Sequence, residues 1–480
     1  MAVLRLERLA PSEIVLLRAV AAAAGRGVEP MLVGGAVRDA RLGRQRRPDV
    51  DVAVASGALD LGRRVASALG GAFVVLDEER GAARVLTGGG QLDITDFRAP
   101  TLAEDLAARD FTVNALAVPV RGLLHGRAQI IDPVGGLGDL GARRLRLAGP
   151  RALTDDPLRA LRAVRLEALL GLRLTPAAGR AVSAAAPALA GVAAERVRDE
   201  LLALLALPET ARALRRADQL RLLSVVFPEI EPMRITRQPL PHRFPVLEHS
   251  LRAVGGADRV VAGPERLAPF GEELATHLGE PIGGGMARRD VLKLAALLHD
   301  VAKPETRRVI HGRVRFFGHD LRGAARSRVI GERLRLPGTV VTAVERLVRH
   351  HLRTLHLAAA GQVTPRARYR FYRDLGPETR DLLLLTLVDA AAVRGDSPLA
   401  LWPRAALIRD LLAGWELQRE AAAAPALIRG EDVMTRFGLG PGPEVGRLLR
   451  RTREAQDLGL VHTREQALTY LDSVVREPLQ

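Results

Sequence analysis

The chain has 480 residues, and its 71 lysines and arginines outnumber 55 aspartates and glutamates, which gives a formal net charge of +16. It has no cysteine, which excludes disulfides, thiolate zinc sites and cysteine nucleophiles, and its length predicts about two to four packed units. No uncharged apolar run reaches the roughly 18 residues that cross a membrane, so we expect a soluble, cytoplasmic protein. The charge suits a polyanionic partner, although the predominance of arginine could equally reflect genomic composition.

The composition and the spacing of apolar residues change near residue 145. Before it, short β-rich runs at 73–77, 83–87 and 91–97 are separated by glycine-rich turns. After it, long segments rich in leucine, alanine and arginine carry apolar residues at helical spacing. We therefore predict an α+β fold with an α/β head and an all-helical body. The predicted domains are a head at 1–145, a helical neck at 146–235, a third domain at 236–395 and a helical tail at 396–480.

The stretch 32–54, LVGGAVRDARLGRQRRPDVDVAV, begins with a predicted strand that ends near Val33 and a helix that follows Gly34 and Gly35. Residues without a Cβ let backbone amides approach an anion closely, and the helix dipole favours negative charge at that end. A triphosphate could therefore bind at this turn, with Arg38 beside it. The alternative is a tight strand-to-helix connection without a ligand.

Two aspartates in the same stretch, Asp49 and Asp51, alternate with Val50, Val52 and Val54. On a strand, residues i and i+2 point the same way, so the valines would face a core and both carboxylates would project together. Two such charges repel unless a cation lies between them, and Mg²⁺ suits their hard oxygen atoms. This pattern fits phosphoryl or nucleotidyl transfer, although a solvated strand face has the same alternation.

A third carboxylate follows in QLDITDF, where Asp93 alternates with Leu92 and Ile94. Asp93 would join the first pair if the two strands are neighbours, whereas Asp96 has the opposite parity. In the next segment, EDLAARDFTVNALAV, the apolar residues would anchor a helix. Its polar residues could contact a ribose or a phosphate, and they are Arg109, Asp110 and Asn114.

The segment TDDPLRALRAVR begins a predicted helix, for which Thr154 or Asp155 is the expected N-cap. Asp156 and Arg159 are three residues apart and would share a helix face. A carboxylate beside a guanidinium can satisfy the donors and acceptors of a nucleobase edge. Arg162 and Arg165 would extend this face as a basic stripe; the alternative is a capped helix with a solvated charged side.

Five motifs occur in a fixed order along the chain: GGAVRD, D-V-D, RDFTVNA, DPVGG and DDPLRALRAVR. Together they resemble the head and neck of the class II tRNA nucleotidyltransferase and bacterial poly(A) polymerase family over about residues 30–175. The resemblance implies a polymerase-beta-like head with a small mixed sheet, and a protein that itself serves as the template for CTP or ATP. It makes Asp49 and Asp51 the catalytic, Mg²⁺-binding carboxylates and Asp93 the auxiliary one. The nucleotide-binding residues would be Gly34, Gly35, Arg38, Arg109, Asp110, Asn114, Asp156, Arg159, Arg162 and Arg165.

The sequence departs from this family pattern in three ways. Asp155 stands in for the usual glutamate, and one arginine of the usual pair before Asp110 is missing. The connection 96–110 is short, whereas relatives that add the whole CCA commonly have a longer flexible loop there, and relatives that stop after CC tend to have it curtailed. The segment after Val54 lacks the Gly-Arg/Lys-Arg/Lys-Phe element of the poly(A) polymerases, which disfavours that activity.

Histidine and aspartate recur in the helical body, most notably in LAALLHDVAKP. With a histidine upstream and an aspartate downstream, this pattern resembles the HD phosphohydrolase superfamily, whose site suits Mg²⁺ or a divalent transition metal such as Mn, Ni or Fe. The primary ligands implied are His249, His299, Asp300 and Asp389.

Further residues of this body would allow a second metal ion, namely His319 and His350. The choice between His350 and His351 stays open at this point, and Lys303 could hold a phosphate. Such a site would hydrolyse cyclic or terminal phosphates on RNA ends; the alternative is a purely structural role.

The main functional prediction is magnesium-dependent addition of CCA, or part of it, from CTP and ATP to the 3′ end of tRNA. Alternatives within the family are an enzyme that adds only CC, or a poly(A) polymerase. An alternative of a different class is an HD-type phosphohydrolase with a non-catalytic, RNA-binding head.

Overall fold

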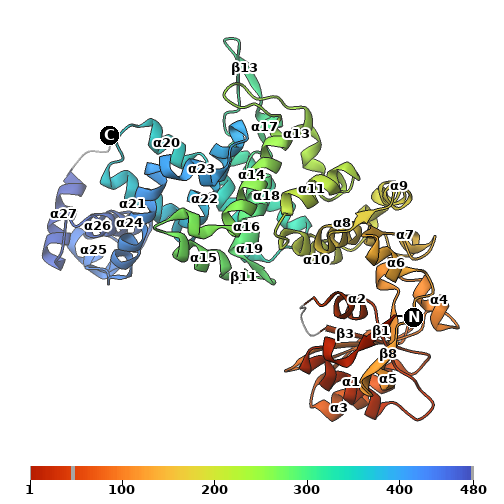
Figure 1. Cartoon of the computed structure of the whole chain (residues 1–480). Coiled ribbons are helices and arrows are strands. Elements are labelled where there is room, and N and C mark those ends of the chain that lie inside the picture. Colours follow the sequence, from red (N-terminus) through yellow and green to blue (C-terminus); the bar gives the residue numbers. More distant parts are fainter. Residues whose placement is uncertain (1, 45–48, 477–480) are drawn as a thin grey trace. The chain divides into compact units, whose positions relative to one another are not determined.

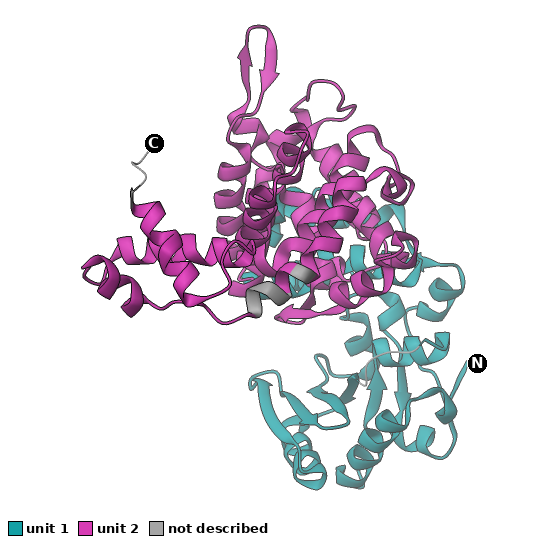
Figure 2. Cartoon of the chain, turned by 90° about the vertical axis from the view of Figure 1, so that its left-hand side faces the viewer, with its two compact units in different colours: residues 1–200, 216–226 teal, residues 201–215, 227–480 magenta. Residues whose placement is uncertain are grey.

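The computed structural model describes residues 2–44 and 49–476. Three parts of the predicted domains lie outside these residues: residue 1, residues 45–48 of the stretch 32–54, and residues 477–480. The chain forms two compact units, residues 1–200 with 216–226 and residues 201–215 with 227–480 (Figure 2). Within the described part, no helix is long and apolar enough to span a bilayer.

A mixed six-stranded sheet forms the core of the first unit, in the order β4-β5-β6-β3-β2-β7. β3 and β6 pair in parallel, and the other neighbours pair antiparallel. The strands are β2 (Met31–Val33), β3 (Asp49–Val54), β4 (Ala72–Asp77), β5 (Ala82–Thr87), β6 (Gly90–Asp96) and β7 (Ala117–Pro119). The three β-rich runs predicted from the sequence are thus confirmed as β4, β5 and β6.

Two helices, α1 (Pro11–Ala23) and α3 (Ala58–Leu69), pack against one face of this sheet. The apolar residues of the alternating strands point to that face, so Val50, Val52, Leu92 and Ile94 are almost completely buried. The polar residues of the same strands therefore project from the opposite face. At the end of β2, the chain turns directly into α2 (Gly35–Leu42).

Helices that follow the sheet complete the first unit. They include α4 (Leu102–Ala107), α5 (Val120–Leu124), α6 (Gly136–Gly141), α7 (Ala152–Asp155), α8 (Arg159–Leu170) and α9 (Pro176–Ala185). The next helix, α10 (Ala194–Leu205), belongs to this unit as far as Glu200. Two short strand pairs accompany them, β1 (Val3–Arg5) with β8 (Arg127–Gln129) and β9 (Arg144–Leu145) with β10 (Arg173–Leu174).

The predicted start of the helix near residue 154 is wrong. Thr154 and Asp155 end the short helix α7, and Asp156 has an extended backbone (φ −152°, ψ 99°) between α7 and α8. The reason is Pro157, because a residue before proline is sterically driven away from helical geometry. Asp156 Oδ1 instead accepts the backbone N–H of Leu158 at 3.2 Å, so Asp156 and Arg159 do not share a helix face.

The helix expected over 104–118 is also shorter than predicted. α4 ends at Ala107, because the following residues pair with another segment: Phe111 forms a β-bridge with Leu147, and the N–H of Thr112 donates to the carbonyl of Arg146 at 2.9 Å. Asn114 consequently lies in a single 3₁₀ turn.

The second unit is almost entirely helical (Figure 1). Its central helices are α14 (Val246–Ala262), α16 (Arg288–Leu298), α18 (His319–Arg333), α19 (Gly338–His350) and α22 (Thr379–Arg394), which pack on one another. Around them lie α15 (Gly271–Gly279), α17 (Lys303–Thr306), α20 (Arg353–Ala359), α21 (Pro365–Leu375) and α24 (Ala406–Ala423), and the hairpins β11 (Pro281–Gly283) with β12 (Met286–Ala287) and β13 (Arg308–Ile310) with β14 (Arg313–Arg315). The last three helices, α25 (Gly430–Phe437), α26 (Pro443–Asp457) and α27 (Arg464–Arg476), have a small apolar core of their own.

Candidate functional site

Three carboxylates lie together on the open face of the sheet. The parallel pairing of β3 and β6 puts Asp51 directly beside Asp93, with Asp49 one pleat away beside Gln91. Asp49 and Asp51 are exposed and Asp93 is partly buried, while the valines between them face the core. The predicted alternation of the strand is therefore confirmed. Three hard oxygen donors on one sheet face suit a divalent cation.

A guanidinium that the sequence reading did not single out completes this cluster. Arg84 of β5 is the register partner of Asp93 and donates two hydrogen bonds of 2.8 Å to its carboxylate. The pKa of Arg84 is raised, first by this hydrogen bond and further by the charges of Asp93, Asp49 and Asp51. Arg84 alternates with the buried residues Ala83 and Val85. The alternation that identified the aspartates could therefore also have placed Arg84 on the same face of the sheet.

The glycine turn between β2 and α2 lies against these carboxylates. Gly34 has a φ of +76°, and a Cβ there would lie 3.5 Å from Asp51 Oδ2 and 3.4 Å from Arg109 Nη1. Only glycine adopts this backbone conformation readily, and a Cβ there would be in van der Waals contact with both side chains. The N-terminal amides of α2 are thus held beside the acidic cluster, as an anion-binding turn requires.

A buried polar network continues from this turn. Arg38 donates to Asn114 Oδ1 and to the Asp39 carboxylate, at 2.8 and 2.9 Å for Asp39, and Asn114 Nδ2 donates to Asp110 Oδ1 at 3.1 Å. Burial alone would raise the pKa of Asp110, but Arg162 and the hydrogen bonds from Asn114 and the Phe111 N–H lower it below its ordinary value. Asp110 is therefore an anion that fixes the neighbouring donors.

Helix α8 supplies arginines that Glu200 of α10 holds in place. Arg162 Nε and Arg165 Nε donate to the two Glu200 oxygens at 2.9 and 2.7 Å, and Arg162 Nη1 lies 3.4 Å from Asp110 Oδ2. The pKa of Glu200 is lowered because both guanidiniums outweigh its burial. The sequence reading missed Glu200, which no local motif connects with α8.

The two residues expected to read a nucleobase have other partners in this structure. Asp156 Oδ2 accepts from Arg196 Nη2 at 2.8 Å. Arg159 is buried and its Nη1 donates to the carbonyls of Ala152 and Ala108 at 3.0 and 3.3 Å.

All ten residues predicted to bind nucleotide line one cleft of about 520 Å³ in the first unit. Asp51 and Asp93 line it as well, together with Arg98 and Arg196, which were not anticipated. The predicted residues in its wall are Gly34, Gly35, Arg38, Arg109, Asp110, Asn114, Asp156, Arg159, Arg162 and Arg165.

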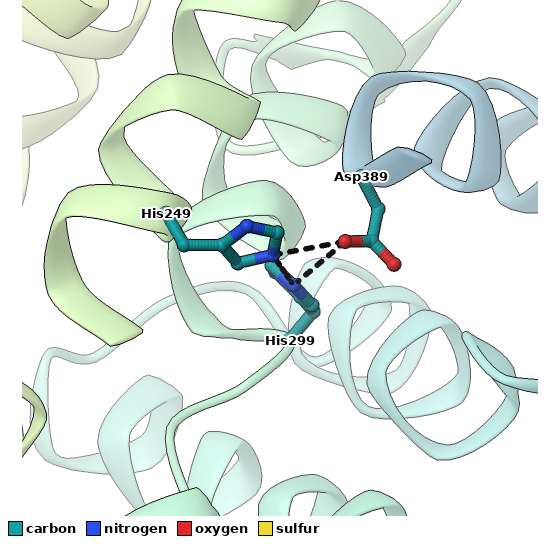
Figure 3. Close-up of side chains that lie close together, drawn as sticks. All are labelled: His249, His299 and Asp389. Atoms are coloured by element: carbon teal, nitrogen blue, oxygen red, sulfur yellow. Dashed lines mark hydrogen bonds and ion pairs between the residues drawn. The ribbon is translucent and has the colours of Figure 1, made fainter. Parts of the chain in front are cut away.

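In the second unit, His249, His299 and Asp389 converge from α14, the end of α16 and α22 (Figure 3). His249 Nε2 lies 3.2 Å from His299 Nε2 and 2.9 Å from Asp389 Oδ1, and His299 Nε2 lies 3.6 Å from the same oxygen. Burial lowers the pKa of His299, but Asp300 and Asp389 together raise it to about 10. A proton on His299 thus offsets charge at the point where a cation would bind.

A second group, Asp300, His319 and His351, adjoins the first. His319 Nε2 lies 3.2 Å from His351 Nε2, and the two lie 3.5 and 3.7 Å from Asp300 Oδ1. The other oxygen, Asp300 Oδ2, lies 3.2 Å from His299 Nε2. Asp300 therefore has one oxygen towards each group and could contribute a ligand to a cation in either.

The histidine tautomers fit metal binding. The Nδ1 atoms of His299, His319 and His351 lie 2.9, 2.6 and 2.6 Å from backbone carbonyls, so each Nδ1 carries a proton and each Nε2 faces the cluster. A bound cation would take the Nε2 lone pairs and would displace the second proton of His299. Nε2 atoms that face one another at 3.2 Å need a proton or a cation between them.

The prediction of His350 as a ligand is corrected by this geometry. α19 ends at His350, and the adjacent His351 turns inwards and is buried in the cluster. His350 lies instead in a separate hollow with Asp320, Arg349 and His356. Lys303 contacts the cluster, since its Nζ lies 2.6 Å from Asp300 Oδ2.

Comparison with known proteins identifies three family models along the chain. A poly A polymerase head domain matches residues 31–146, a probable RNA and SrmB-binding site of polymerase A matches residues 171–234, and an HD domain matches residues 246–392.

Curated relatives match nearly the whole chain. The A-adding tRNA nucleotidyltransferase of Deinococcus radiodurans is 38% identical over 93% of this chain and 95% of its own length. The CC-adding tRNA nucleotidyltransferases of Geobacter sulfurreducens and Thermus thermophilus are 32% and 37% identical, over 93% and 92% of this chain and 92% of each relative.

Solved structures share the fold. A CCA-adding enzyme with ATP superposes with a TM-score of 0.66 at 21% identity, covering 98% of this chain and 97% of the other. The Thermotoga maritima CCA-adding enzyme complexed with tRNA gives a TM-score of 0.60 at 20% identity over the same shares of the two chains.

Proposed function

Because the chain belongs to the tRNA nucleotidyltransferase family, we propose that it transfers nucleotides from CTP or ATP to the 3′ end of tRNA with Mg²⁺. The observation that carries this proposal is the group of carboxylates on β3 and β6, beside the Gly34 turn in a cleft lined with arginine. Since tRNA matures in the cytoplasm, we propose the same compartment for the enzyme.

Asp49, Asp51 and Asp93 would hold Mg²⁺, which when bound activates the terminal hydroxyl and steadies the departing pyrophosphate. The amides of Gly34 and Gly35 would bind the triphosphate at the N-terminus of α2. The carboxylates stand on rigid strands and the turn is anchored by Arg38 and Asn114, so the α-phosphate would be held in line with the attacking oxygen.

We propose that Asp156 and Arg159 read the nucleobase, although both have protein partners in this structure. Arg196, which pairs with Asp156, is about half exposed. An ion pair of this kind opens at little cost, so an incoming base could replace Arg196 at the Asp156 carboxylate. Arg159 would meet the base with the guanidinium donors that do not bind backbone carbonyls.

We further propose that the enzyme adds part of the CCA end, either CC or the final A. The connection 96–110 contains the compact helix α4, closed by a capping box between Thr101 and Glu104, in place of a long loop. The three full-length relatives described above also have names that specify CC or A alone.

The test uses one tRNA that lacks CCA and one that ends in CC, each with CTP, ATP or both, followed by sequencing of the 3′ ends. CC on the first tRNA, or A on the second alone, supports a partial enzyme; complete CCA contradicts it, and long A tails indicate a polymerase. D49A and D51A should abolish incorporation, and survival of activity in either would contradict the proposed centre. D60A removes an exposed aspartate of the same unit and is the control.

A second activity is favoured by the facing Nε2 atoms of the histidine cluster. We propose that this cluster binds one or two divalent metal ions, Mg, Mn, Ni or Fe, and hydrolyses phosphoesters at RNA ends. His249, His299, Asp300, His319, His351 and Asp389 would be the ligands. A phosphohydrolase with an inert head is disfavoured, because the head retains its complete set of carboxylates.

A further inference from the structure

Beside the histidine cluster lies a pocket that no motif in the sequence identified. It has a volume of about 360 Å³ and is lined by Arg237, Gln238, His242, Arg243, Phe244 and Pro245. These residues belong to the irregular segment between α13 (Glu231–Ile235) and α14.

Two contacts hold this segment against the elements that carry the proposed metal ligands, and a third lies within the segment. The ring of His242 packs edge to face on His249, with 5.3 Å between centroids. The N–H of Arg243 donates to the carbonyl of Val393 at 3.1 Å, which fixes the segment to α22. Gln238 Nε2 donates to the carbonyl of Phe244 at 3.2 Å and closes the segment on itself. The pocket is therefore built into the unit.

Lys303 links the pocket directly to the histidine cluster. Its Nζ donates to Gln238 Oε1 and to Asp300 Oδ2, both at 2.6 Å, so one ammonium joins a pocket wall to the carboxylate that faces both histidine groups. His242, which lines the pocket, also contacts the proposed ligand His249.

The pocket is electropositive. The exposed guanidiniums of Arg237 and Arg243 have no ion pair within the described residues, and no carboxylate lines the wall. Arginines without an acidic partner, placed beside a buried ammonium, are suited to a phosphate. The Nδ1 of His242 is buried without a hydrogen-bond partner in the described part of the chain.

We propose that this pocket binds a second phosphate of the substrate. The histidine cluster would then act on a terminal nucleotide that carries the reacting 3′-phosphate and, on its 5′ side, a second phosphate or a phosphodiester. Arg237 and Arg243 would contact the second phosphate while the histidine cluster holds the first. This inference rests on the proposed phosphoester hydrolysis. It specifies an RNA end, or a nucleoside 3′,5′-bisphosphate, in preference to a 3′-monophosphate.

The test compares the intact protein with the double variant R237Q/R243Q and with the control R266Q/R404Q. The control removes the same charge from exposed arginines of the same unit, away from the pocket. With Mn²⁺ or Ni²⁺ present, hydrolysis is measured on cytidine 3′,5′-bisphosphate and on cytidine 3′-monophosphate. We expect the pocket variant to raise KM for the bisphosphate by about tenfold or more, with kcat and the monophosphate reaction changed less than about twofold.

An equal loss on both substrates, or no loss on either, would overturn the proposal. Calorimetric binding of the bisphosphate to the metal-free protein is the second readout, and the variant should bind about tenfold more weakly than the control. Any binding at the cleft of the first unit is the same in both proteins, because the substitutions lie in the second unit. If no protein hydrolyses either substrate, the phosphohydrolase function fails, and the calorimetric difference still decides whether the pocket binds phosphate.

Discussion

At the scale of single residues, Gly34 is the most constrained position in the nucleotide cleft. Its backbone conformation (φ +76°, ψ −140°) is almost exclusive to glycine, and a Cβ would be in van der Waals contact with Asp51 and Arg109. We expect G34A to lower the free energy of unfolding by about 1–3 kcal/mol. It should also raise KM for the nucleotide. Urea unfolding and incorporation kinetics measure the two effects.

Gly57 supplies the matched control for this substitution. It also has a positive φ of +86°, but a Cβ there would meet nothing within 4 Å. G57A should therefore cost stability without changing KM. If G34A lost only as much stability as G57A and bound nucleotide normally, the close contact between the turn and the carboxylates would have no functional role.

The proposed catalytic carboxylates show how much the alternation of a strand can predict. Asp49, Asp51 and Asp93 were predicted because a period of two separates them from buried valine, leucine and isoleucine. Arg84 follows the same rule, but a lone arginine on a strand carries no chemical signal until its partner is known. The choice between His350 and His351 depended on where α19 ends, and a shift of one residue reverses which ring faces inwards.

At the scale of elements, the pairing of α8 with α10 depends on Glu200, whose carboxylate binds Arg162 and Arg165. The pKa of Glu200 in the folded protein is below its ordinary value of 4.5. The stability it contributes is thus present above about pH 4.5 and is lost as the pH falls through the lower, folded pKa. We expect E200Q to cost about 1–3 kcal/mol at neutral pH.

Urea midpoints at pH 7 and near pH 3 measure this effect. The difference between E200Q and the unmodified protein should shrink at the acidic pH, because Glu200 of the unfolded chain then binds a proton and the stabilisation by the ionised carboxylate is partly lost. D199N is the control, since Asp199 is the exposed neighbour and a surface charge contributes little. A deficit of E200Q that is the same at both pH values would contradict an electrostatic origin.

The elements also show where sequence reasoning failed. The helix predicted from the apolar spacing after residue 156 is confirmed from Arg159 onwards. Asp156 lies outside it, because Pro157 excludes helical geometry for the residue before it. Glu200 could not be assigned, because its partners lie 35 and 38 residues away in the sequence. Local patterns therefore identified α8 but not what positions it.

At the scale of the whole molecule, each unit contains one complete candidate centre. The carboxylates and the nucleotide cleft belong to the first unit, and the histidine cluster belongs to the second. We therefore expect the two activities to be separable. D51N should reduce nucleotide incorporation by at least about a hundredfold and leave metal-dependent hydrolysis unchanged.

D389N is the reciprocal variant, since Asp389 lies on α22 and is about one-quarter exposed. It should abolish hydrolysis and leave incorporation unchanged. Both reactions are assayed on the same purified proteins, with tRNA and with a 3′-phosphorylated nucleotide. Loss of both activities in either variant would show that the two units depend on each other.

The hydrogen-bonded pair of Arg84 and Asp93 has a consequence for how the first centre meets its ion. Without a metal, three neighbouring carboxylates would destabilise the sheet, but the guanidinium already offsets part of their charge. We therefore expect the head to fold without a bound metal ion. A divalent cation would then need to bind only when the nucleotide does, as an exchangeable ligand and not as a permanent structural ion.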